Sequence, residues 1–180
     1  MREKILSITA KVIANEGLDA VSIRHICDKA GVKAPTVYYY FNDKDGLIDS
    51  VLMLAYKRYT KKQLEYVKDD APLVALVKSW DIFFEFIEHE TDLFHAIIIA
   101  HLRQRIPQEG LELFHIIAGF YKKLEEKNKL QQPYLTAARI FYATAYGLAL
   151  VYISQGKNPN LKSQISLTRD LCIKSLVAGF

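Results

Sequence analysis

The sequence predicts an all-α protein made of few, long helices, and three observations favour this class. The 180 residues include only eight glycines and five prolines, which is low for a many-stranded protein with a turn after every strand. Apolar residues recur three or four positions apart, and no alternating run of strand length occurs. With 51% hydrophobic and 24% charged residues, the chain has the composition of a globular protein with a buried core.

Residues 2–16 form the first expected helix, and a short second helix follows. Isoleucines and valines stand at helical spacing until Gly17, a residue type that adopts the left-handed conformation closing many helices. Ser22 then offers a capping hydroxyl to a helix of about two turns, which Gly31 ends.

Pro35 begins the third expected helix, because its missing N–H costs nothing in a first turn. That helix runs to about Phe41, and Asp43 is placed to cap a long fourth helix. The fourth helix fades into the polar stretch 56–70, which is the best candidate for a boundary between two lobes. We place this boundary after residue 60.

Five further helices are expected in the second lobe: 72–90, 92–105, 109–127, 136–155 and 163–180. Segments rich in turn-forming residues separate them, among them a break at Ile106-Pro107, a loop at 128–133 and a turn at 156–160.

The distribution of charge and the length of the apolar stretches limit the classes of function that the chain could have. Residues 1–60 hold nine Lys and Arg against seven Asp and Glu, and the rest hold fifteen against thirteen, so charge alone does not indicate nucleic acid. The N-terminus lacks the features of a secretory signal. The longest charge-free stretch, 140–156, is shorter than the roughly 20 residues of a spanning helix, so we expect a cytoplasmic protein with no membrane segment. Cys27 and Cys172 are expected to be reduced and buried.

Residues 22–41, SIRHICDKAGVKAPTVYYYF, have the layout of a helix-turn-helix. Cys27 and Ala30 are small enough to let the two helices approach, and Gly31 allows the chain to reverse. Val32 and Val37 fill the angle between the helices. A helix has the diameter to enter the major groove of DNA, so the second helix is a candidate reading element.

These residues resemble the TetR family of bacterial transcriptional regulators. The resemblance covers about residues 3–55 in detail, and it is carried by Ser22, Ile26, the turn 30–32, Pro35-Thr36, the aromatic run 38–41, Lys44 and Leu47. It implies a three-helix DNA-binding domain at 1–60, joined by a long helix to a ligand-binding and dimerisation bundle at 61–180. It also implies the residues at the DNA: Ser22, Arg24, Lys33, Ala34, Pro35, Thr36, Tyr38, Tyr39, Tyr40 and Lys44.

Side-chain chemistry separates the roles of these positions. Phosphate contacts, which position a protein without reading sequence, suit Thr36, Tyr38 and Lys44. Arg24 suits a guanine edge, and Ala34 and Pro35 suit a thymine methyl group.

Lys33 and Ala34 cap a helix poorly, so the first N–H groups of the reading helix are open either to a phosphate or to water. Successive helical residues differ by about 100°, so we expect at least one of the three tyrosines, with Phe41 and part of Tyr38, in the core. Lys29 and Lys33 are open to a second interpretation as a solvated face.

The second lobe is rich in large aromatic side chains, which predict either an ordinary core or an apolar cavity. By resemblance it holds a small effector, for which the candidate residues are Trp80, Phe83, Phe84, Phe94, His95, Phe114, Tyr142 and Tyr146. Three histidines, His89, His95 and His101, fall about 120° apart on a helix, so we expect no metal and no cofactor. An acidic row shares one helix face and suits solvent or a cationic ligand: Asp81, Glu85, Glu88 and Asp92.

The segment 136–155 is apolar all round and rich in alanine, so it must be covered on every side. By resemblance, the helices 136–155 and 163–180 pair with their copies in a homodimer. A two-fold dimer also places two reading helices about 34 Å, or a multiple of it, apart along DNA.

We therefore expect a DNA-binding transcriptional regulator, a repressor released from a pseudo-palindromic operator by a small apolar or aromatic effector. One alternative is a regulator of the same kind controlled by a protein partner or by no ligand. Another is an enzyme using the aromatic lobe, which is disfavoured because no catalytic constellation or Gly-rich phosphate loop occurs.

Overall fold

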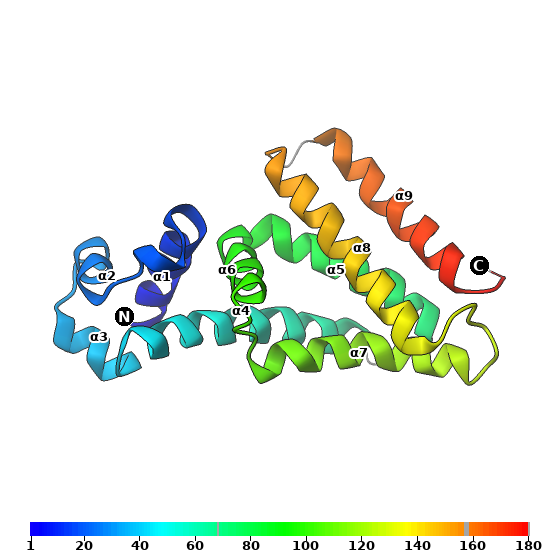
Figure 1. The fold of residues 1–180 in the computed structure, drawn as a ribbon, viewed down its shortest axis with the longest axis horizontal. Helices are drawn as coiled ribbons and strands as arrows, with labels where there is room; N and C mark the ends of the chain where they lie inside the picture. Colours follow the sequence, from blue (N-terminus) through cyan, green and yellow to red (C-terminus); the bar gives the residue numbers. More distant parts are fainter. Residues whose placement is uncertain (68, 157–158, 180) are drawn as a thin grey trace. The chain divides into compact units, whose positions relative to one another are not determined.

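The computed structural model describes residues 1–67, 69–156 and 159–179. Figure 1 shows the helices that these residues form: α1 (Arg2–Glu16), η1 (Leu18–Ala20), α2 (Ile23–Ala30), α3 (Ala34–Phe41), α4 (Lys44–Val67), α5 (Pro72–His89), α6 (Thr91–Leu102), α7 (Gln108–Glu125), α8 (Tyr134–Ser154) and α9 (Pro159–Leu176). Across the described ranges the sole β-type pairing is an isolated antiparallel bridge between Leu130 and Val177. The all-α prediction is confirmed.

The polar stretch 56–70 is helical through Val67, which the sequence analysis did not foresee. Tyr56, Tyr59 and Gln63 are buried and stand three or four positions apart, so one face of α4 stays covered although the segment looks hydrophilic. The uninterrupted helix therefore runs through the expected boundary at residue 60.

The last helix begins at Pro159, four residues before the expected start at Ser163. Proline suits a first helical position because no N–H is lost there. The helix also ends earlier than expected, at Leu176. Residues 157 and 158 of the expected turn lie outside the described residues.

The helices gather into two compact units, and each unit is made of two pieces of chain. The first comprises residues 1–60 and 88–111, and the second comprises 61–87 and 112–180. Helix α6 therefore belongs to the first unit, where it packs on α1. The functional division at residue 60 remains a prediction.

The loop after α6 is fixed to the start of α4 by Arg105. The guanidinium donates from Nε to Asp49 Oδ1 at 2.8 Å and from Nη1 to Asp45 Oδ1 at 3.0 Å. It also donates from Nη2 to the backbone carbonyl of Asp45 at 3.2 Å. A second arginine at the same end of α6, Arg103, pairs with Asp19 of η1 at 2.8 Å. The end of α6 thus contacts two parts of the segment 1–60.

The second unit has an aromatic core. In this unit α8 packs on α9. The ring of Phe141 contacts those of Trp80 and Tyr121, with centroid separations of 5.3 and 5.9 Å. Within the described residues α8 is long and apolar enough to cross a membrane, with a mean hydropathy of 1.2, and a third of its most apolar stretch is buried. The core helices of globular proteins meet the same criteria. The sequence analysis expected no such helix, because it considered only the stretch without charged residues, and that stretch begins after Arg139.

Candidate nucleic-acid interface

Helices α2 and α3 form the expected helix-turn-helix, and local hydrogen bonds set its geometry. Ser22 Oγ accepts from the backbone N–H of His25 at 3.2 Å and caps α2. Gly31 ends α2 with a φ of 65°, a left-handed conformation that a side chain would strain. The N–H of Val32 donates to the carbonyl of Cys27 at 3.1 Å, which closes the end of α2. The chain then turns directly into α3.

The start of α3 has no side-chain cap, as the sequence predicted from Lys33. The N–H of Thr36 donates to the carbonyl of Lys33 at 2.9 Å, and Pro35 has no N–H. At the start of α3, fewer free N–H groups are therefore available to a phosphate or to water than the absence of a cap suggested.

The three tyrosines of α3 all lie on its outer side. Tyr39 is 82% exposed, Tyr38 50% and Tyr40 37%, whereas Val37 and Phe41 are buried. The expectation that at least one tyrosine is a core residue is wrong, and the burial of Phe41 is confirmed. An eight-residue helix needs only two core positions four apart, and Val37 and Phe41 fill them. The tyrosine rings support one another, since Tyr39 and Tyr40 meet edge to face at 5.1 Å.

Glu16 holds two basic residues of α2. Its carboxylate pairs with Lys29 Nζ and with His25 Nε2, both at 2.9 Å. The hydrogen bond from Lys29, followed by that from His25, lowers the pKa of the Glu16 carboxyl. The charge of Lys29 is thus countered within the protein. By contrast, no carboxylate in the described part of the chain pairs with Arg24, Lys33 or Lys44, and all three are exposed.

Gly46 allows α4 to begin close against the end of α3. Asp43 Oδ1 accepts from the N–H of Gly46 at 2.7 Å and caps α4, as expected. A Cβ on Gly46 would lie 2.1 Å from the carbonyl oxygen of Phe41. Sequence reasoning missed this residue, although a glycine in the first turn of a capped helix is the signal that a backbone passes nearby.

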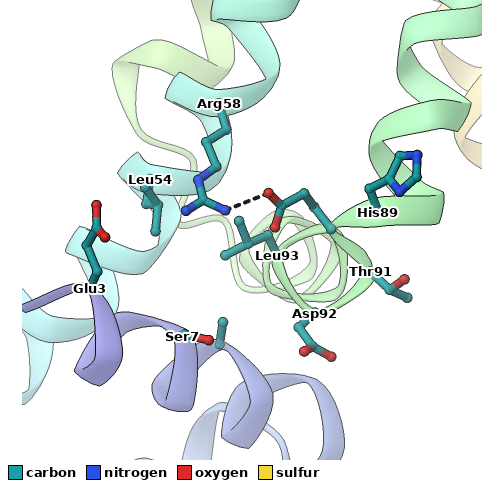
Figure 2. A pocket seen from close by; sticks show the side chains of 10 residues that line it. Glu3, Ser7, Leu54, Arg58, His89, Thr91, Asp92 and Leu93 are labelled. Atoms are coloured by element: carbon teal, nitrogen blue, oxygen red, sulfur yellow. Dashed lines mark hydrogen bonds and ion pairs between the residues drawn. The ribbon is translucent and has the colours of Figure 1, made fainter.

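The first unit also contains a cavity of about 260 Å³ between α1, α4 and the start of α6 (Figure 2). Arg58 Nη1 donates to Glu90 Oε1 at 2.5 Å along one side, and Leu54 and Leu93 supply apolar lining. None of the residues expected at an effector site lines this cavity.

The expected effector residues divide between the two units. Phe94 and His95 lie on α6 in the first unit, and the other six lie in the second. Trp80, Phe83 and Phe84 are buried in the second unit. That any of the eight binds a ligand remains a prediction.

Four of these aromatic residues form a chain of ring contacts that joins three helices of the second unit. Phe83 of α5 stacks on Tyr146 at 5.2 Å, and Tyr146 stacks on Tyr142 at 4.4 Å. Phe114 of α7 meets Tyr142 edge to face at 6.0 Å. The Tyr142 hydroxyl donates to that of Tyr146 at 2.8 Å, and burial raises the pKa of Tyr142 to about 12. Tyr142 is therefore a neutral hydroxyl at physiological pH.

The buried polar atoms of the second unit that have no hydrogen-bond partner among the described residues include Trp80 Nε1 and Tyr121 Oη. Both side chains are at least 99% buried. Burial without a partner usually costs a polar group about 1–3 kcal/mol, so native structures rarely tolerate it without a reason.

Comparison with known proteins identifies the family of residues 5–51. Residues 5–51 match the family model of bacterial regulatory proteins of the tetR family. This segment belongs to the TetR family. This places the helix-turn-helix of α2 and α3 in a known DNA-binding domain, and it confirms the resemblance stated from the sequence.

Individual TetR-family proteins resemble more of the chain. The transcriptional repressor KstR2 of Mycolicibacterium smegmatis is 28% identical over 133 residues, which are 73% of this chain and 59% of that protein. Among solved structures, a TetR family regulator from Marinobacter aquaeolei has a TM-score of 0.82 at 17% identity, covering 98% of this chain and 95% of that one. The fatty acid degradation regulator FadR from Bacillus halodurans also has a TM-score of 0.82 at 17% identity, covering 95% and 93%. The structural matches show that the TetR fold extends over nearly the whole chain.

Proposed function

We propose that this TetR-family protein is a transcriptional repressor that binds a pseudo-palindromic operator as a homodimer and leaves it when a small effector binds. The observation that carries the proposal is the outer surface of α3. Three consecutive tyrosines are exposed there, and the flanking cations Arg24, Lys33 and Lys44 have no ion-pair partner among the described residues. Unpaired cations beside an exposed helix suit the phosphates of a duplex. We call the residues 24, 33–36, 38–40 and 44 the DNA face.

Each part of the DNA face suits a different part of the duplex. Lys44 at the start of α4 and the Thr36 hydroxyl suit phosphates on the two sides of the groove that α3 enters. The Ser22 hydroxyl is already used in capping α2, so its contribution is to hold Arg24 in place. The named function of KstR2 as a repressor supports the sign of the regulation.

An exposed apolar face on α8 supports the homodimer. Ile140, Leu150 and Val151 are each at least 40% exposed and recur at helical spacing, with Gly147 between them. On α9, Leu167 and Leu171 are more exposed still, at 58% and 60%. Adjacent apolar side chains at helical spacing usually pack against another protein surface. A second copy of the same two helices would cover them in a two-fold arrangement.

The core of the second unit supports a small effector. The chain of stacked rings supplies apolar contact area, and the unpartnered N–H of Trp80 and hydroxyl of Tyr121 supply donors. We therefore infer an apolar or aromatic effector that carries a hydrogen-bond acceptor. FadR is named as a regulator of fatty acid degradation, which agrees with control by a largely apolar molecule. Such an effector would act by stabilising a state in which the two reading helices no longer match the operator spacing.

Selection from a random duplex library at near-physiological salt tests the proposal. We expect the wild-type chain to enrich a palindrome, and Tyr39→Ala and Lys44→Ala to lose it. Tyr66→Ala and Lys127→Ala are matched controls, because both side chains are exposed and belong to the second unit, whereas the DNA face belongs to the first. Weak, salt-sensitive binding without an enriched sequence would contradict the proposal, and so would equal losses in the controls.

Light scattering tests the dimer, and effector screening tests release. We expect the mass of two chains for the wild type and of one chain for Leu150→Glu, which places a charge on the apolar face of α8. A wild-type monomer that still selects a palindrome would refute the interface. If representative steroids, fatty acids and aromatic compounds all leave operator affinity unchanged, effector control fails.

A further inference from the structure

We propose that the cavity of the first unit, between α1, α4 and the start of α6, is a second ligand site that binds a free α-amino acid with an aliphatic side chain (Figure 2). The inference goes beyond the proposed function, because this cavity belongs to a different unit from the aromatic core. Three observations lead to it: the walls of the cavity, two carboxylates without a cation, and the donors of Arg58.

Helical spacing and two small residues leave the cavity open. Glu3, Ser7 and Ala10 follow one another at intervals of four and three residues, so they share the face of α1 that borders the cavity. Helix α1 packs on α6, and Ser7 and Ala10 are too small to fill the space at this end of the contact. The volume of about 260 Å³ lies just below the range of about 300–1,000 Å³ that is usual for ligand pockets. The cavity therefore suits a molecule smaller than a drug.

Two carboxylates on the wall have no ion-pair partner among the described residues. They are Glu3 in the first turn of α1 and Asp92 in the first turn of α6. The third carboxylate of the wall, Glu90, is already paired with Arg58. An ammonium group is a compact cation with three donors. It would supply the partner that Glu3 and Asp92 lack.

Arg58 supplies the complementary contact. Its Nη1 donates to Glu90 Oε1 at 2.5 Å, which uses one of the five N–H groups of the guanidinium. The side chain is 45% exposed, and Figure 2 shows it reaching from α4 toward the hollow. The remaining donors match the two oxygens of a carboxylate. A diamine suits the site less well, because its second ammonium would face this guanidinium.

The apolar part of the wall indicates the side chain of the ligand. Ala10 and Leu93 are buried, Leu54 is half-buried, and all three line the cavity. An aliphatic group placed against them is removed from water, which favours binding. The wall as a whole therefore matches a molecule with one ammonium, one carboxylate and a short aliphatic chain.

Isothermal titration calorimetry with leucine and two of its fragments tests the ligand class. Isocaproate is leucine without its amine, and isopentylamine is leucine without its carboxylate, while both keep the aliphatic chain. We expect leucine to bind and each fragment to bind at least about fivefold more weakly, because each loses one charged contact. The proposal is overturned if leucine does not bind or if either fragment binds as tightly as leucine.

Substitutions test whether leucine occupies this cavity. Ser7→Leu fills the space without changing a charge, and Asp92→Asn removes one carboxylate that has no cation. Both should weaken leucine binding about fivefold or more. Asp28→Asn is the matched control, because Asp28 is an exposed carboxylate of the first unit that does not line the cavity. Wild-type affinity in both cavity variants would place leucine elsewhere and overturn the proposal.

Thermal unfolding by circular dichroism shows whether the variants are folded. If Ser7→Leu does not fold, Glu3→Gln takes its place, because Glu3 is exposed and pairs with no cation among the described residues. These measurements contain no DNA, so the two proposals fail separately. A chain that selects a palindrome but does not bind leucine contradicts only the second site.

Discussion

Replacing Gly46 by alanine should destabilise the protein, although alanine is the better helix former. In an open helix interior the substitution gains up to about 1 kcal/mol. At Gly46 the new Cβ would lie 2.1 Å from the Phe41 carbonyl oxygen, whereas protein Cβ atoms essentially never approach another heavy atom within 3.0 Å. The junction between α3 and α4 must therefore open by about 1 Å.

The steric cost at Gly46 is larger than the gain in helix propensity, because the obstructing atom belongs to the backbone. A flexible side-chain end would swing away at little cost, but the Phe41 carbonyl moves only with a buried ring. Overpacking of this kind costs about 1–3 kcal/mol. Set against a helix gain of up to about 1 kcal/mol, this leaves a net loss of up to about 2 kcal/mol. For a chain of this size, that loss lowers the melting temperature by up to roughly 8 °C.

Thermal unfolding followed by circular dichroism measures this, with Gly119→Ala as the matched control. Gly119 lies in α7 and has no atom within 4 Å of its missing Cβ. It should gain up to about 1 kcal/mol, which raises the melting temperature by roughly 2–4 °C. If Gly46→Ala were as stabilising as the control, the close approach of α3 and α4 described here would be wrong.

Substitutions at three further positions test contacts in the first unit. Ser22→Ala removes the acceptor for the His25 N–H and should cost about 1 kcal/mol in urea unfolding, whereas Ser22→Asp should restore most of it; equal stability of all three proteins would contradict the cap. Arg105→Ala should cost about 1 kcal/mol or less, because its partners Asp45 and Asp49 are largely exposed, and the difference from wild type should shrink at 1 M salt. Glu16 has a lowered pKa in the folded state, so its stabilising contribution is present above about pH 4.5 and is lost as the pH falls through the folded pKa. Urea titrations at pH 7 and pH 3 should therefore show a smaller loss for Glu16→Gln than for wild type, and an identical loss would refute the coupling.

Local signals predicted the boundaries of the helix-turn-helix well. A capping hydroxyl at Ser22, a left-handed glycine at Gly31 and a capping carboxylate at Asp43 each act within three or four residues, so the sequence alone reveals them. The long α4 was foreseen only in part, because buried Tyr59 and Gln63 have the appearance of surface residues.

Contacts between distant residues were beyond the sequence analysis. Arg105 meets Asp49 across 56 positions, and no local pattern indicates the partner. The tyrosines of α3 were misassigned for a related reason. Periodicity shows that Tyr38 and Tyr39 point in different directions. It does not show how much of the helix surface the rest of the protein covers, which depends on packing.

The two-piece construction of the first unit limits how its DNA-binding part could be exchanged between proteins. Helix α6 packs on α1, and Phe94 of α6 is fully buried. A hybrid regulator joined after residue 60 would take its α6 from the other protein. The side chains of α1 would then pack against residues that differ from their native partners. Recombination that keeps residues 1–60 together with 88–111 would preserve this contact, so in this chain the portable piece of sequence is discontinuous.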